Sequence, residues 1–86
     1  MKITISSRAE KELKNLSKIN QIAITKKIRS LTVNQLISEE RLKGYKNIFR
    51  FRVGDYRIVY KKTLQEVFIV LIGHRKNIYD LLKRLF

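Results

Sequence analysis

Two stretches of the chain carry side chains that could bind and cleave a phosphodiester. They contain Arg50, Arg52, Arg57, His74, Arg75 and Tyr79. Guanidinium groups present a planar fork of donors that fits phosphate oxygens. Cleavage of RNA needs cations around the pentavalent phosphate, a group that helps to deprotonate the ribose 2′-hydroxyl, and a donor for the departing 5′-oxygen. These residue types supply a candidate for each role without a metal ion.

Each candidate also has a structural alternative. The arginines could form a solvated basic face, since charge describes association rather than fold. A lone histidine after a strand is more often structural than catalytic, and Tyr79 could be a core residue with its hydroxyl at the rim. No cluster of Asp, Glu, His and Cys has metal-ligand spacing in the sequence, so we expect neither a metal ion nor another cofactor.

The arginines take their arrangement from a predicted β-hairpin. From Ile48 the hydrophobic period is two, and Gly54-Asp55 fits the centre of a two-residue turn. This turn places Arg52 opposite Arg57 and separates two faces. One face holds Phe49, Phe51, Val53, Tyr56, Ile58 and Tyr60, and the other holds Ile48, Arg50, Arg52, Arg57, Val59 and Lys61. Opposed like charges destabilise a sheet, so we expect an anion to bind the second, cationic face.

The other elements must place the C-terminal candidates beside this hairpin. Residues 2–6 alternate as a strand, Ser7 with Glu10 predicts a capping box that begins a helix, and a second helical pattern follows. The apolar run 67–72 predicts a central strand covered on both sides, and a final helix comes after it. Residues 34–47 have no firm periodicity, so we expect a connection there and leave its conformation open. The predicted order is βααβββα.

We therefore expect an α+β fold. A small antiparallel sheet, made of the N-terminal strand and a three-strand meander, packs against an α-hairpin and is followed by a C-terminal helix. A chain of 86 residues has room for one domain, over residues 1–86.

Composition indicates the kind of partner. The chain has 20 Lys and Arg residues against 7 Asp and Glu residues, a net charge of +13 that attracts nucleic acid or an acidic protein. It has no cysteine, and its N-terminus alternates instead of forming a long apolar stretch. We therefore expect a cytoplasmic protein, and the narrow apolar stripes argue against action on a membrane.

Three motifs, spread over nearly the whole chain, resemble the RelE/ParE toxin superfamily. They are Leu42-Lys43-Gly44, the run FRFRVGDYRIVY at 49–60 and the run GHRKNIY at 73–79. The resemblance implies a small sheet packed by an α-hairpin, and an acidic antitoxin that wraps the toxin and represses their shared operon. It also implies a choice of target: RelE-like members cut mRNA in the ribosomal A site, whereas ParE-like members inhibit DNA gyrase without cutting.

In RelE-like members, the active site combines basic residues on the middle strands with an arginine and a tyrosine near the C-terminus. By motif position these roles carry over to Arg50, Arg52, Arg57, Arg75 and Tyr79. The implied reaction is attack of the 2′-oxygen on the adjacent phosphate, which yields a 2′,3′-cyclic phosphate and a free 5′-hydroxyl. This sequence has arginines where lysines can stand, and arginine is a poor general base. His74 could supply the base instead.

The leading interpretation is a type II toxin that acts as a ribosome-dependent endoribonuclease. Catalysis is assigned to Arg57, Arg75, Tyr79 and His74, and binding of RNA phosphates to Arg50, Arg52, Lys43 and Lys61. The expected partners are an acidic antitoxin, with a heterotetramer as one arrangement, and mRNA in the ribosomal A site. The alternatives are a gyrase inhibitor without enzymatic activity and a nucleic-acid-binding module without chemistry, which would lose affinity steeply with added salt.

Overall fold

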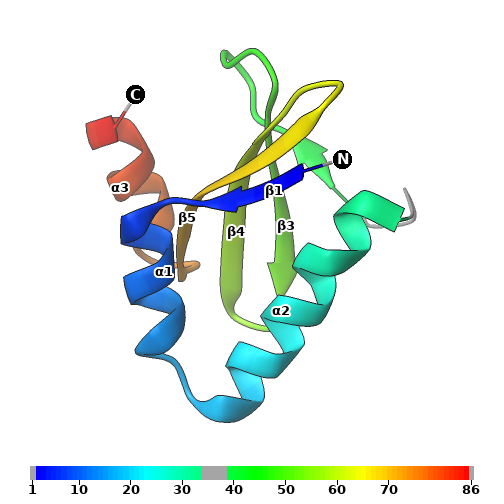
Figure 1. Ribbon diagram of the computed structural model, residues 1–86. Coiled ribbons are helices and arrows are strands. Elements are labelled where there is room, and N and C mark those ends of the chain that lie inside the picture. Colours follow the sequence, from blue (N-terminus) through cyan, green and yellow to red (C-terminus); the bar gives the residue numbers. More distant parts are fainter. Residues whose placement is uncertain (1, 34–38, 86) are drawn as a thin grey trace.

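The computed structural model describes residues 2–33 and 39–85, and Figure 1 shows a twisted sheet with helices packed around it. The elements are β1 (Lys2–Ile5), α1 (Ser7–Lys14), α2 (Lys18–Val33), β2 (Glu40–Arg41), β3 (Ile48–Val53), β4 (Tyr56–Lys62), β5 (Glu66–His74) and α3 (Ile78–Leu85). The α+β class and the predicted order of elements are confirmed. The short strand β2 is an addition, and the rest of its connection, residues 34–38, lies outside the described residues.

The sheet has the strand order β1-β5-β4-β3-β2. Strands β3, β4 and β5 form the predicted antiparallel meander. However, β1 pairs with β5 in parallel, with Ile3 opposite Val67, so the prediction of an entirely antiparallel sheet is wrong. The physical reason is the long connection between the two strands. After the helical hairpin and the first strands of the meander, the chain enters β5 in the same direction as β1.

One face of the sheet is covered by α1 and α2, which lie in front of it in Figure 1. The buried residues of this first core are Ala9, Ile24, Ile28, Leu31, Phe51, Ile58, Tyr60, Val67, Ile69 and Ile72. Phe49, Val53 and Tyr56 pack against it. The predicted apolar face of the hairpin therefore faces the helical hairpin, as its period of two requires.

The opposite face carries a second, smaller core beneath α3. It consists of Ile48, Val59, Leu71, Ile78 and Leu82. This cluster divides the predicted cationic face. Ile48 and Val59 are buried under α3, whereas the arginines lie around the edge of the cluster. It also explains the continuous apolar run in β5, whose residues contribute to both cores.

Helix α1 begins where the sequence predicts, but its cap lies one residue earlier. The hydroxyl of Ser6, not that of Ser7, accepts a hydrogen bond from the backbone N–H of Ala9 at 3.0 Å. Ser6 also donates its backbone N–H to the carbonyl of Ile69 at 2.9 Å. Pairing with β5 thus holds Ser6 in the extended conformation that a cap residue needs.

The predicted hairpin turn is confirmed. Gly54 has φ +59°, and the partners across β3 and β4 are those that a Gly54-Asp55 turn requires, from Val53 with Tyr56 to Phe49 with Tyr60. Among the described helices, none is long and apolar enough to cross a membrane.

Candidate phosphate-binding site

Three arginines share the α3 side of the sheet. Arg52 lies directly opposite Arg57, and Arg50 pairs with Val59, one of the residues buried beneath α3. On its other side, Arg57 faces Gly73 of β5, which has no side chain to cover it. The hairpin register thus gathers positive charge at one end of the sheet, next to the first turn of α3.

Arg57 is a partly buried member of this group. Its Nε is buried, and no hydrogen-bond partner for it occurs among the described residues. Burial lowers the pKa of Arg57, and the positive charges of Arg52, Arg50 and Arg75 lower it further, whereas Asp55 opposes the shift. A partly buried cation with an unsatisfied donor is costly to a folded protein, and an anion bound there would reduce the cost.

Tyr79 reaches the cluster from the first turn of α3. The guanidinium carbon of Arg50 lies 5.3 Å from the centroid of the Tyr79 ring, within the range of a cation–π interaction. Tyr79 is 41% exposed, so part of its side chain remains accessible to another molecule. An aromatic ring beside a phosphate-binding arginine can stack on a nucleotide base.

Arg75 approaches from the end of β5. Its backbone N–H donates to the carbonyl of Asp55 at 2.8 Å, and its Nε lies 3.8 Å from the Asp55 carboxylate. These contacts tie the end of β5 to the turn between β3 and β4. They keep Arg75 near Arg57, on whose pKa its charge acts.

Glu40 is part of this site, and the sequence interpretation missed it. Its carboxylate lies 2.7 Å from Arg50 and 3.7 Å from Arg52, so it occupies a position that a phosphate could take. The hydrogen bond from Arg50, together with the charge of that residue, lowers the pKa of Glu40. One signal was available: Glu40 is among only seven acidic residues, and it stands just before the Leu42-Lys43-Gly44 motif.

His74 lies on the other face of the sheet. It pairs with Tyr56, whose ring it meets edge to face at 5.8 Å, and Tyr56 packs against the core beneath the helical hairpin. Its Nδ1 accepts a hydrogen bond from the backbone N–H of Lys76 at 3.2 Å. The neighbouring Gly73 faces α3, where an added Cβ would lie 3.0 Å from Ile78. Alternation along β5 therefore separates the His74 ring from the arginines.

Comparison with known proteins identifies the family. The sequence profile of the family described as "ParE toxin of type II toxin-antitoxin system, parDE" matches residues 3–79. The chain belongs to this family of toxins. Toxin RelE3 of Methanocaldococcus jannaschii is 32% identical over 85 residues, which cover 93% of this chain and 97% of that protein. The membership in the RelE/ParE superfamily that the motifs predicted is confirmed.

Solved toxin structures share the fold. The RelB–RelE antitoxin–toxin complex from Methanococcus jannaschii matches with a TM-score of 0.71 and 27% identity, over 91% of this chain and 96% of the matched chain. The isolated RelE toxin of E. coli matches with a TM-score of 0.74 and 23% identity, over 99% and 98% of the two chains.

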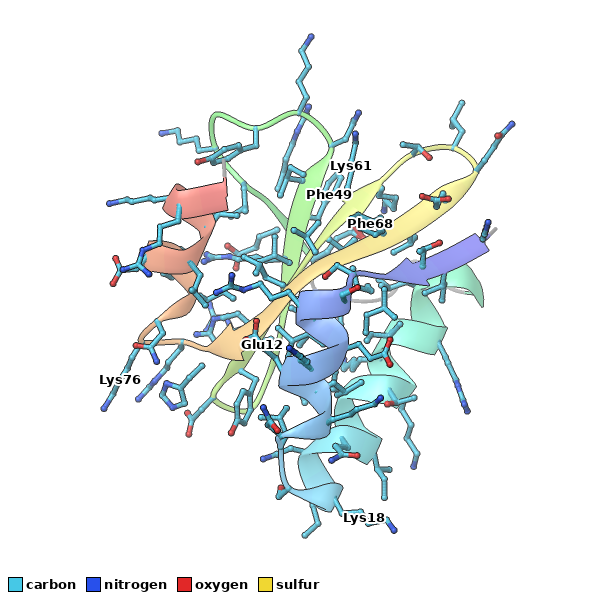
Figure 2. The ribbon with its side chains drawn as sticks, turned by 60° about the vertical axis from the view of Figure 1, so that its left-hand side comes forward. Glu12, Lys18, Phe49, Lys61, Phe68 and Lys76 are labelled. Carbon is cyan, nitrogen blue, oxygen red and sulfur yellow. The ribbon has the colours of Figure 1, made fainter. Side chains whose placement is uncertain are left out.

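The remaining two candidates of this toxin lie away from Arg57 and Arg75. Lys61 is opposite Ile48, four residues beyond Arg57 along β4, which corresponds to about 13 Å. Lys43 belongs to the connection that leads into β3 at the same end of the sheet, and both lysines are exposed. Figure 2 shows Lys61 far from Lys76, which directly follows Arg75. These lysines could contact only phosphates that flank the arginine site.

Proposed function

We propose that this toxin is an endoribonuclease that cleaves mRNA in the ribosomal A site without a metal ion. The observation that carries the proposal is the guanidinium of Arg57, which lies within a group of further arginines. Its Nε is buried and has no partner among the described residues. A relative named as a RelE toxin supports the same branch of the superfamily. Preorganised cations of this kind stabilise the charge that develops on a phosphate during cleavage.

In the proposed reaction, Arg57 and Arg75 hold the scissile phosphate and stabilise its pentavalent state. Arg50 and Arg52 hold a flanking phosphate. Lys43 and Lys61 are available to bind phosphates further along the RNA. Tyr79 stacks on a base or donates a hydrogen bond to the RNA. The 2′-hydroxyl loses its proton to a base, and the 2′-oxygen forms a bond to phosphorus as the bond to the 5′-oxygen breaks. The departing 5′-oxygen takes a proton from water, which leaves a 2′,3′-cyclic phosphate and a 5′-hydroxyl.

We assign the general base to Glu40 in preference to His74. Arginine does not deprotonate in proteins, and the His74 ring lies on the opposite face of the sheet. Glu40 is held ionised by Arg50, so it is able to accept a proton. When an incoming phosphate takes over the contacts of Arg50 and Arg52, the Glu40 carboxylate is released beside that phosphate, within reach of the 2′-hydroxyl.

The proposed protein partner is an acidic antitoxin, and the proposed location is the cytoplasm. A net charge of +13 favours association with an acidic protein. A similar chain occurs in a complex described as RelB–RelE antitoxin–toxin, which supports the same kind of partner for this toxin.

Inhibition of DNA gyrase without cleavage is the second candidate function. It is favoured by the description of the matching family, which refers to ParE and parDE. In that case the arginines would contact protein or DNA, and removal of Glu40 would have little effect.

The test is inducible expression in bacteria, with primer extension on abundant messages. We compare the wild type with Arg57→Ala and Arg75→Ala, and use Lys27→Ala as a control because Lys27 is an exposed cation of α2, which covers the other face of the sheet. New ends within translated frames, which require translation and disappear in the two arginine variants, would support the nuclease. Growth arrest with intact messages would favour gyrase inhibition, and no arrest would contradict both activities.

A further inference from the structure

Helix α2 carries apolar residues on two faces. Ile24, Ile28 and Leu31 are buried in the first core. Ile19 and Ile22, by contrast, are 81% and 51% exposed. At about 100° per residue, Ile22 points roughly away from the buried stripe, so neither core of this fold accounts for it. Two large apolar side chains exposed one turn apart on a helix are typical of a surface that another molecule covers.

Cations surround Ile22, the second of these isoleucines. A hollow along the outer side of α2 is lined by Lys18, Gln21, Ile22, Thr25, Lys26 and Arg29. Lys18 and Lys26 are exposed, and Figure 2 shows Lys18 at the tip of the helical hairpin, pointing away from the sheet. The outer face of α2 is therefore an apolar centre with a positively charged rim.

The charge of the rim decides between possible occupants. A second copy of this chain would place lysines against lysines, in a molecule that already has a net charge of +13. Such like-charge contacts oppose association. Nucleic acid would satisfy the lysines, but its phosphates would leave Ile19 and Ile22 without apolar partners. An acidic segment with a row of apolar side chains satisfies both features.

We propose that the outer face of α2 binds an acidic amphipathic segment of the antitoxin. This inference rests on the antitoxin partner of the proposed function and adds where that partner docks. Apolar side chains of the segment cover Ile19 and Ile22, and its carboxylates meet Lys18 and Lys26. Helices α1 and α2 cover the opposite face of the sheet from Arg57, so this contact leaves the arginine site uncovered.

The probe is a synthetic helical peptide of about 18 residues, roughly five turns, with leucines along one face and glutamates elsewhere. A second peptide of the same charge has serines in place of the leucines. Each is labelled, and its binding to the purified full chain is measured by fluorescence anisotropy at physiological ionic strength. The variants are Ile19→Ser/Ile22→Ser, Arg57→Ala, and Leu64→Ser, a matched control because Leu64 is 97% exposed in the turn between β4 and β5.

We expect the leucine peptide to bind the wild type, Arg57→Ala and Leu64→Ser equally. Its affinity for the double isoleucine variant should fall at least about tenfold. The serine peptide should bind all four proteins weakly and alike. Melting curves check that each variant is folded. We expect this for Ile19→Ser/Ile22→Ser and Leu64→Ser because those side chains are exposed, and for Arg57→Ala because it removes a cation with an unsatisfied donor.

Two results would overturn the proposal. One is a leucine peptide that does not bind the wild type, or that binds the double isoleucine variant as tightly. The other is loss of binding in Arg57→Ala, which would move the contact to the arginine face. The peptide-binding measurements involve no RNA. Their result therefore does not depend on whether this toxin cleaves mRNA.

Discussion

Arg52 and Arg57 face each other across the β3–β4 ladder, so the sheet holds two like charges in directly opposed positions. Such a pair costs up to about 1 kcal/mol. The buried Nε of Arg57 has no partner among the described residues, which adds a second cost. The arginine site therefore opposes the stability of the fold, as expected of a site that an anion completes.

Replacement of Arg57 by Met should separate stability from function. Met keeps an unbranched apolar stem and removes both the charge and the unsatisfied donor. We expect the free energy of unfolding in urea to stay the same or rise by about 0.5–1 kcal/mol, while growth arrest is lost. Lys27→Met, a change of an exposed cation on α2, should alter neither quantity. A loss of about 2 kcal/mol in Arg57→Met would instead give the guanidinium a structural role.

Glu40→Gln tests the general base. Removal of a positioned base typically slows a reaction by about 10²–10⁴, so cleavage should fall in this range. Binding of RNA should not weaken, because the carboxylate that competes for Arg50 and Arg52 is gone. The control is Glu39→Gln, since both Glu39 oxygens bind Lys62, at 2.9 Å, instead of the arginines. Equal cleavage by the two variants would remove Glu40 from the mechanism.

The pH dependence of cleavage tests the assignment of the general base to Glu40. Arg50 lowers the pKa of Glu40 from its ordinary value of 4.5, and release by phosphate returns it toward that value. A Glu40 base is ionised above this pKa, so the rate of single-turnover cleavage on programmed ribosomes should not fall between about pH 8 and 5.5. A rate that falls steadily as the pH drops across this interval would contradict the assignment.

The hairpin was predictable because two signals fix the same register. The period of two assigns Phe51 and Ile58 to one face, and the turn at Gly54 fixes which residues oppose each other. Every arginine of β3 and β4 was therefore placed correctly from the sequence.

Glu40 and His74 were harder to place, for physical reasons. Strand β2 has two residues, too few to show a period, so nothing in the pattern brings Glu40 to the arginines. Strand β5 is apolar on both faces, so its sequence pattern does not indicate on which face the side chain of its last residue, His74, lies. A register shift between Val59 and Tyr60 also breaks the simple count across β4 and β5. Only the tertiary structure shows on which side His74 lies.

Gly54→Val should destabilise the toxin through its backbone. Nothing lies within 4 Å of a Cβ at this position, so crowding is absent, but φ is +59°. A residue with a Cβ pays roughly 1–2 kcal/mol for this conformation, and we expect the loss to be at the upper end for branched Val. Asn tolerates positive φ better, so Gly54→Asn should melt nearer to the wild type. Equal melting temperatures for the two variants would contradict this account.

Glu12→Gln should stabilise the toxin at neutral pH. Glu12 Oε1 is buried without a hydrogen bond, although Arg8 Nε lies 3.4 Å away, and burial raises the pKa of Glu12. Figure 2 shows Glu12 on α1 beside β5. Because the folded pKa is the higher one, stability is greatest below the unfolded value of 4.5 and is lost as pH rises through the folded value.

The neutral amide removes that loss. We expect Glu12→Gln to gain a few tenths of a kcal/mol at pH 7, after allowance for solvent screening, and to gain little or nothing near pH 4. Urea unfolding at both pH values measures the difference. Glu10→Gln is the control, because Glu10 is exposed and pairs with Lys14 at 3.0 Å, so its loss should be neutral or slightly destabilising. A gain that is equal at the two pH values would show that the ionised Glu12 carboxylate is not its cause.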